Sequence, residues 1–222
     1  MKISPHVIIT GSFCLFALSC RDVQPVFVSE QVTGYYLRGI VTSKSGIPLD
    51  SVTVILYYNY SYVGSTPIDT VQVSVPDTST YVNVSVYTTK NIFIRTLFSG
   101  TMPHAGVISS YPWDGSDGDK NPVPSGLYRI RYTVGSTVVK SVPYIVDGHP
   151  TAMTDSTGYF TLTGDNLPIG LRFDANSSSI PSVGVYQITQ QITVQFFKNN
   201  FTSSYTSLWL TRDEVTYHTF TF

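Results

Sequence analysis

The chain contains only two cysteines, Cys14 and Cys20, and both lie near its start. The rest of the chain can therefore form no disulfide framework and no thiolate metal site. Charge is also scarce, since charged residues make up 12% of the 222 residues and the formal net charge is −1. So neutral a chain has neither a basic patch for nucleic acid nor an acidic tail, and we expect no nucleic-acid partner.

Helical periodicity is missing as well. No stretch after the first twenty residues carries apolar residues at i, i+3, i+4 and i+7 over three turns, so we expect almost no helix. Tyrosine and phenylalanine are abundant instead, at 16 and 12 residues, and valine and threonine recur throughout. These residue types favour pleated, half-buried strands. The sequence therefore predicts an all-β fold, and the chain is long enough for one large or two small domains.

The first twenty residues have the layout of a secretory signal. Met1-Lys2 is a short positive start, residues 7–18 are largely apolar, and Ala17-Leu18-Ser19-Cys20 ends the segment. The apolar run is too short for a stable membrane span. Its ending resembles a lipobox, the motif at which bacterial lipoprotein signal peptides are cut just before a cysteine.

This resemblance implies that residues 1–19 are removed and that Cys20 becomes a lipidated first residue. Residues 20–35 would then be the lipid anchor and tether. Several acyl chains give stable anchoring, so we expect a bacterial cell-envelope protein held on the outer membrane. An ordinary cleaved signal with an incidental Cys20 is the alternative, and an uncleaved signal is another.

Strand and turn patterns begin at Tyr36. Gly39-x-Val41 and Gly46-x-Pro48-Leu49 precede the alternating run Val52–Tyr58, and a Thr-Asp-x-x-Gly-x-Phe turn follows much later at residues 154–160. This order resembles the carboxypeptidase regulatory-like (transthyretin-like) β-sandwich, with a long segment placed between its two parts. The resemblance predicts an outer β-sandwich made of residues 36–65 and 148–222, completed by strands after residue 185.

The intervening segment contains the sequence WDGSDGDKNPVPSGLY at residues 113–128. It resembles the hairpin of the immunoglobulin-like domain in flagellar hook-capping proteins, and the resemblance covers residues 66–147. It implies an immunoglobulin-like β-sandwich inserted into the outer one. The residues themselves predict two buried aromatic rings, turns at the Asp-Gly pairs and a strand that restarts at a glycine. The hairpin residues are Trp113, Asp114, Gly115, Asp117, Gly126 and Tyr128.

Few residues qualify as a metal site. Asp114, Asp117 and Asp119 form a compact acidic loop, but their spacing is not that of an EF-hand, so turn chemistry is favoured over a weak calcium site. The histidines after Cys20 are His104, His149 and His218, which stand in separate segments. A zinc site would need two of them close in sequence, so we expect no metal and no cofactor.

One aromatic strip is a candidate binding site. Tyr58, Tyr60 and Tyr62 point to one face if the strand stays extended. They could stack against sugar rings or line an apolar groove, although cross-strand packing or an interface between modules is the favoured interpretation.

The chemistry-bearing patterns of enzymes are missing. No Gly-x-Ser-x-Gly elbow occurs and no cysteine is free to act as a nucleophile, so we expect no catalysis. We expect a lipid-anchored protein with a structural, adhesive or binding role and protein partners in the envelope. The alternative is a surface lipoprotein that captures glycans through exposed tyrosines. An enzyme with an acidic site is a further alternative.

Overall fold

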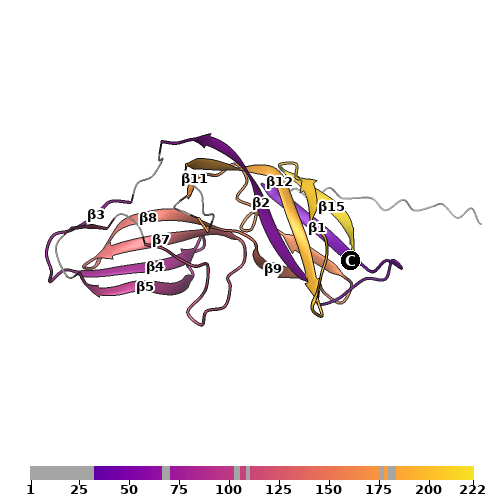
Figure 1. Cartoon of the computed structure of the whole chain (residues 1–222), viewed down its shortest axis with the longest axis horizontal. Helices are drawn as coiled ribbons and strands as arrows, with labels where there is room; N and C mark the ends of the chain where they lie inside the picture. Colours follow the sequence, from indigo (N-terminus) through magenta and orange to yellow (C-terminus); the bar gives the residue numbers. More distant parts are fainter. Residues whose placement is uncertain (1–32, 67–70, 103–105, 109–110, 176–177, 180–183) are drawn as a thin grey trace, which may run out of the picture. The chain divides into compact units, whose positions relative to one another are not determined.

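The computed structural model describes residues 33–66, 71–102, 106–108, 111–175, 178–179 and 184–222. Strands connected by turns make up these segments, with no α-helix among them, so the all-β prediction is confirmed (Figure 1). No helix in the described part of the chain is long and apolar enough to span a membrane.

Two sheets hold the first apolar core. Sheet A has the order β10 (Tyr159–Leu162), β1 (Tyr35–Thr42), β15 (Glu214–Thr221), with β1 and β15 parallel. Sheet B has the order β11 (Arg172–Asp174), β12 (Val185–Lys198), β2 (Thr53–Gly64), β9 (His149–Met153), and β12 also pairs with β13 (Phe201–Thr202) and β14 (Thr206–Trp209). Alternate residues of β2 and β12 are buried, as expected for strands with one face on a core.

A glycine permits close packing inside this first core. Gly39 lies in β1, and a β-carbon added there would stand 2.1 Å from the Phe160 ring and 2.9 Å from the Phe220 ring. The two phenylalanine rings can therefore pack directly against the β1 backbone, with their centroids 5.8 Å apart. A glycine at position 39 therefore suits this central strand, because its lack of a β-carbon leaves room for the two rings.

Two further sheets hold a second core. Sheet D has the order β5 (Phe93–Thr101), β4 (Tyr81–Thr88), β7 (Gly126–Val134), β8 (Thr137–Val146), and sheet C pairs β3 (Val73–Val75) with β6 (Gly106–Ile108). The buried residues of the second core all come from residues 71–146, whereas those of the first core come from residues 37–58 and 145–220. Whether residues 66–147 fold as an independent domain within the outer sandwich stays a prediction.

Hydrogen bonds around Ser125 connect the two groups of sheets. The Ser125 side chain is fully buried, and its hydroxyl donates to the carbonyl of Leu56 at 2.8 Å and accepts from the N–H of His149 at 2.9 Å. The Asn166 amide donates to the Ser125 carbonyl at 3.2 Å, and the Tyr58 hydroxyl donates to the Asn166 carbonyl at 2.7 Å. A buried hydroxyl satisfied in this way holds its neighbours in one arrangement.

Candidate functional site

The predicted lipidation residue Cys20 lies outside the described residues, as do the signal segment 1–19 and most of the tether. The same holds for His104. Lipidation at Cys20 and removal of residues 1–19 therefore stay predictions.

The predicted tyrosine strip does not form an open binding face. Tyr58 is only 4% exposed and belongs to the first core, so its ring is not available to a ligand. Tyr60 packs against the same core, with its ring 5.7 Å from that of Phe173. Tyr62 alone is exposed, at 61%, and its ring meets Tyr186 edge to face at 5.7 Å. Tyr58 and Tyr60 therefore cover the core, and only Tyr62, near the end of β2, stays exposed.

A half-buried carboxylate, that of Asp147, accompanies these tyrosines. The N–H of Tyr58 donates to Asp147 Oδ1 at 2.8 Å, and burial raises the pKa of Asp147 although this hydrogen bond opposes the rise. Burial also raises the pKa of Tyr60, and the negative charge of Asp147 adds to the rise. Asp147 thus accepts a backbone hydrogen bond at the point where the two groups of sheets meet. It precedes Gly148, which has a φ of +73°.

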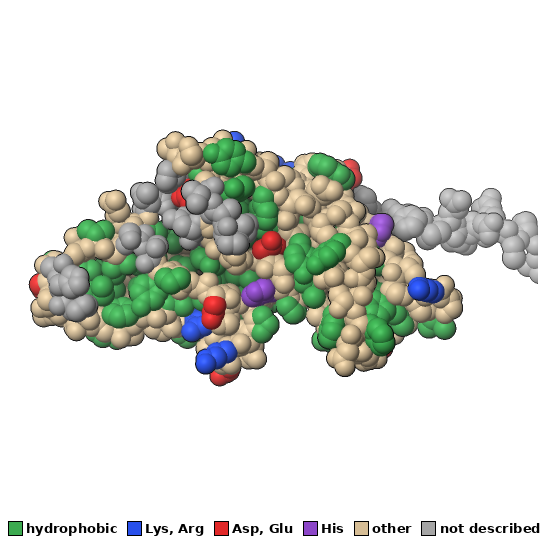
Figure 2. Space-filling model, viewed as in Figure 1, with side chains coloured by type: hydrophobic (Ala, Val, Ile, Leu, Met, Phe, Trp, Pro, Cys, Tyr) green, Lys and Arg blue, Asp and Glu red, His purple; other side chains and the backbone are tan. Residues whose placement is uncertain are grey.

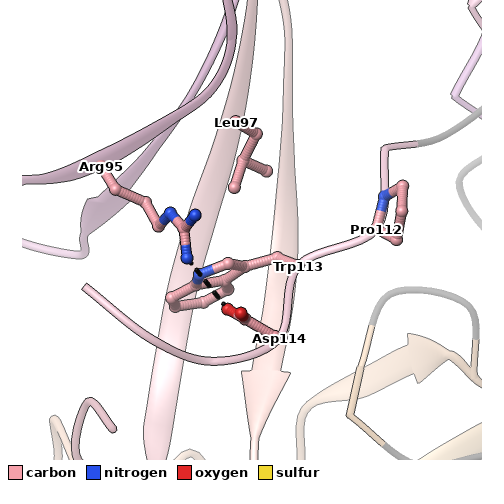
Figure 3. Close-up of a pocket in the computed structure, with 5 residues that line it drawn as sticks. All are labelled: Arg95, Leu97, Pro112, Trp113 and Asp114. Atoms are coloured by element: carbon pink, nitrogen blue, oxygen red, sulfur yellow. Dashed lines mark hydrogen bonds and ion pairs between the residues drawn. The ribbon is translucent and has the colours of Figure 1, made fainter. Parts of the chain in front are cut away.

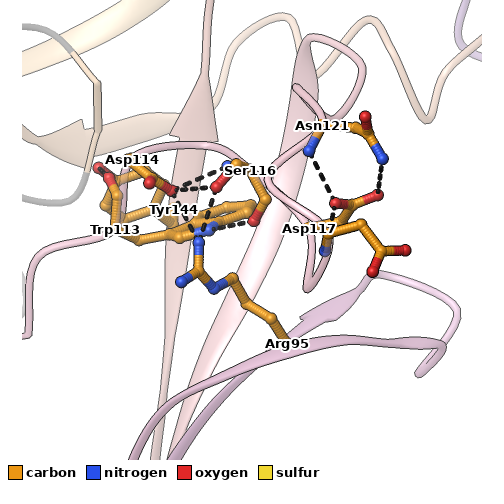
Figure 4. A network of polar contacts seen from close by, with 8 residues as sticks. Arg95, Trp113, Asp114, Ser116, Asp117, Asn121 and Tyr144 are labelled. Carbon is orange, nitrogen blue, oxygen red and sulfur yellow. Dashed lines mark hydrogen bonds and ion pairs between the residues drawn. The ribbon is translucent and has the colours of Figure 1, made fainter.

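Trp113 forms the centre of the hairpin that the sequence singled out. Its side chain is 5% exposed, and its ring lies 5.1 Å from Tyr128 and 5.3 Å from Tyr144. The indole N–H donates to the carbonyl of Ser116 at 2.8 Å, and the Tyr144 hydroxyl donates to the Trp113 carbonyl at 2.7 Å (Figure 4). Burial raises the pKa of Tyr144 to about 12. Both predicted aromatic residues of the hairpin therefore lie in the second core.

The carboxylates of the acidic loop already accept hydrogen bonds from residues of the protein itself. Asp114 Oδ1 accepts from the N–H and hydroxyl of Ser116 at 3.0 and 2.6 Å, and from Arg95 at 3.1 Å (Figure 4). Asp117 Oδ1 accepts from the N–H groups of Asp119 and Asn121, both at 2.9 Å. The Ser116 hydroxyl lowers the pKa of Asp114, and the Asn121 N–H lowers the pKa of Asp117.

These bonds match the turn chemistry that Asp-Gly pairs predict. Gly115 has a φ of +72°, and Lys120 has a φ of +67°. Gly126 begins β7 in a tight space, because a β-carbon there would stand 3.1 Å from the Asp165 carbonyl. Within the described residues, no three His, Cys, Asp or Glu side chains are grouped as metal ligands. His149 instead contacts the Val123 carbonyl through Nδ1 at 2.8 Å, and His218 packs on Phe220.

A cavity of about 380 Å³ lies beside the hairpin and is lined by Arg95, Leu97, Pro112, Trp113 and Asp114 (Figure 3). The indole forms one wall, and the Arg95 guanidinium lies beside it with its partner Asp114. The Arg95 guanidinium also donates to the Ser116 hydroxyl at 2.7 Å. The charged groups of the cavity are therefore already engaged with each other, which suits a structural role.

A different surface carries two of the exposed aromatic residues, Tyr205 and Trp209. Leu208 of β14 is buried, so Ser207 and Trp209 point to the outward face of sheet B, together with Gln191 and Thr193, their partners on β12. Trp209 is 66% exposed and Tyr205, which precedes β14, is 62% exposed. Over the region of β2 and β12, Figure 2 shows hydrophobic side chains scattered on the surface. We call this outward face of β2, β12 and β14, with Tyr205, the sheet B platform.

Polar contacts hold the side chains of the sheet B platform in place. The ring of Tyr57 meets that of Tyr205 edge to face at 5.4 Å, and its hydroxyl donates to Gln195 Oε1 at 3.3 Å. Asn59 Nδ2 donates to the Gln191 carbonyl at 3.3 Å and to Thr193 Oγ1 at 3.2 Å. The sequence analysis missed this surface, although the alternation of Trp209 with Leu208 could have signalled an outward-facing tryptophan.

Residues 59–137 match the family model described as the FlgD Ig-like domain. The matched segment contains the whole Trp113–Tyr128 hairpin, and it confirms the prediction of an immunoglobulin-like domain of this type in the chain. It runs from within β2 to the first residue of β8. Searches of the curated proteins and of the solved structures found no match.

Proposed function

We propose that the chain is a lipid-anchored, non-catalytic binding component of the bacterial cell envelope. A transthyretin-like sandwich carries the immunoglobulin-like domain as an insertion, and Cys20 holds the whole on the outer membrane through its acyl chains. The support for the anchor is the positive start, the apolar run and the small residues before Cys20. The support for the insertion is the split of the first core between residues 37–58 and 145–220.

The sheet B platform is the observation that carries the binding role. Two large aromatic side chains are exposed by about two thirds on this face: Trp209 at the end of β14 and Tyr205 just before β14 begins. Exposed aromatic groups of this kind, with an apolar body and a polar end, are typical of binding surfaces. The β-sandwich architecture by itself does not indicate this role, because it serves many functions.

The non-catalytic part of the proposal rests on how the acidic side chains are used. Asp114 and Asp155 each accept hydrogen bonds from a hydroxyl and an N–H group of their own turns, and the hydroxyls of Ser116 and Thr157 are the main reason that the pKa of each carboxyl is lowered. Asp117 accepts from the N–H groups of its turn, which lower its pKa. A general acid or base works best with a pKa near the operating pH. These three carboxylates are thus suited to holding turns rather than to transferring protons.

Photo-crosslinking in cells tests the proposal. A photoreactive residue at position 207 lies on the sheet B platform, and one at position 219 lies on the outward face of sheet A and serves as the matched control. We expect covalent adducts with an envelope component from position 207 and none from position 219. Adducts from neither position, or from both equally, would contradict a binding role for the platform. Turnover in a broad hydrolase screen, abolished by one Asp→Asn change, would contradict the non-catalytic role.

A further inference from the structure

We propose that the sheet B platform binds an extended, neutral, β-linked polysaccharide. This inference rests on the proposed function and names the ligand class of the same surface. Three properties of the platform carry it: the aromatic rings, the polar groups between them, and the lack of charged side chains around the rings.

The aromatic rings offer stacking surfaces for sugars. Trp209 and Tyr205 are exposed, and Tyr57 stands edge to face against Tyr205. An aromatic face carries negative charge density, and the C–H groups on the apolar side of a pyranose ring carry partial positive charge, so the two surfaces attract each other. Exposed rings of this kind gain by covering their apolar area with such a partner.

The spacing of the rings selects an extended ligand. Tyr205 and Trp209 are four residues apart, which corresponds to about 13 Å along a strand. One sugar ring cannot cover both aromatic side chains, whereas an extended chain of several units can. A β-linked chain presents such a ribbon with apolar faces, so it can contact both rings at once.

Amides and hydroxyls lie between the rings. Gln195 is held from two sides, because its Nε2 donates to the Ser203 carbonyl at 3.2 Å while Oε1 accepts from Tyr57. Thr193 Oγ1 and Ser207 Oγ are 2.7 Å apart. These side chains are already ordered before a ligand arrives, which reduces the entropy lost on binding. Hydroxyls and amides each retain further donor or acceptor capacity for sugar hydroxyls.

The platform strands carry no charge on their outward side. Around the exposed rings the outward residues are Ile55, Tyr57 and Asn59 of β2, Gln191, Thr193, Gln195 and Phe197 of β12, and Ser207 and Trp209 of β14. Arg172 of β11 stands further along β12, where its Nε donates to Gln187 Oε1 at 3.2 Å. An anionic glycan would be recognised through Arg or Lys, which form charge-assisted hydrogen bonds with carboxylates and phosphates. The uncharged platform therefore favours a neutral polysaccharide over the cell-wall peptidoglycan, whose peptides carry carboxylates.

Affinity electrophoresis of the full chain in mild detergent tests the inference. The gels contain soluble neutral β-linked polysaccharides (mixed-linkage β-glucan, xyloglucan, galactomannan), an α-linked glucan or an anionic polysaccharide, and isolated sacculi are used in a parallel sedimentation assay. We expect retardation by at least one neutral β-linked polysaccharide, and at least tenfold weaker binding for Trp209→Ala and Tyr205→Ala. The matched control Tyr217→Ala, 61% exposed on sheet A, should bind as the wild type does.

A second variant, Ser207→Arg, separates loss of binding from loss of folding, because it adds bulk and charge over the platform at an exposed position. We expect it to lose binding while keeping the wild-type melting temperature. The inference is overturned if no neutral β-linked polysaccharide retards the chain, if only sacculi or anionic chains bind, or if Tyr217→Ala loses as much as Trp209→Ala. If retardation is absent while position 207 still crosslinks to an envelope protein, this inference fails and the proposed function stands.

Discussion

Replacing Trp113 by alanine should destabilise the second core strongly. The change removes ring contacts with Tyr128 and Tyr144, and such aromatic pairs contribute about 0.5–1.5 kcal/mol beyond their buried area. It also leaves the carbonyl of Ser116 without the indole donor, at a cost of about 1–3 kcal/mol if that group stays buried. Together with the cavity left behind, Trp113→Ala should lower the free energy of unfolding by about 3–5 kcal/mol.

Hydrogen exchange measured by mass spectrometry can assign this loss to one core. Because about 1.4 kcal/mol corresponds to a factor of ten, amides in β4 and β7 should exchange at least about a hundredfold faster in Trp113→Ala. Amides in β12 should change much less. The matched control is Trp209→Ala, which removes the other tryptophan from an exposed position and should cost less than about 0.5 kcal/mol. A loss below about 1 kcal/mol for Trp113→Ala would refute the reasoning.

Three further predictions address the outer sandwich, the acidic loop and the domain boundaries. Gly39→Ala should lower the free energy of unfolding by about 1–3 kcal/mol, because the added carbon overpacks against Phe160. The control Gly64→Ala has no heavy atom within 4 Å of the added carbon and should leave the urea midpoint unchanged. Equal urea midpoints for the two variants would contradict the packing. Because the pKa of Asp117 is lowered in the folded protein, its stabilisation is complete above the ordinary carboxyl pKa of about 4 and is lost as the pH falls through the lowered value. The difference in urea midpoint between wild type and Asp117→Asn should therefore be present at pH 7 and vanish at about pH 2. Calcium should not raise the melting temperature of either protein. A calcium-dependent rise that is lost in Asp117→Asn would show a metal site. Replacing residues 66–147 by a short Gly-Ser linker should leave a cooperatively folded outer sandwich, and a molten product would show that the boundaries are misplaced.

Much of the fold could be predicted from local patterns. The alternation in residues 185–197 predicts a strand with one buried face, and β12 spans Val185–Lys198 with Ile192, Val194 and Phe196 buried. The Trp113 hairpin was predictable because its turns depend on the backbone freedom of Gly115 and on Asp carboxylates that accept hydrogen bonds mainly from residues of the same loop.

The orientation of the tyrosines could not be predicted in the same way. Residues 52–58 are apolar on both faces, with Leu56 and Tyr58 on one side and Ile55 and Tyr57 on the other. Periodicity assigns residues to two faces but does not say which face covers a core when both are apolar. Only pairing with β12 decides this, and pairing over such a sequence distance leaves no local signal.

The sheet B platform depends on the same long-range pairing. Tyr57 comes from β2 and Tyr205 precedes β14, and β12 brings them together from opposite sides. Each tyrosine alone has no feature that separates it from the other tyrosines of the chain. The contact between them becomes visible only in the assembled sheet.

Metabolic labelling with a palmitate analogue tests most directly whether the chain is a lipid-anchored envelope protein. The wild-type chain and Cys20→Ser are expressed in parallel, and each is examined for label and for sedimentation with the membrane fraction. We predict that the wild type carries the label and sediments with membranes, whereas Cys20→Ser carries none and leaves the membrane fraction once its signal is processed. Equal labelling of the two proteins, or none in either, would contradict lipidation at Cys20.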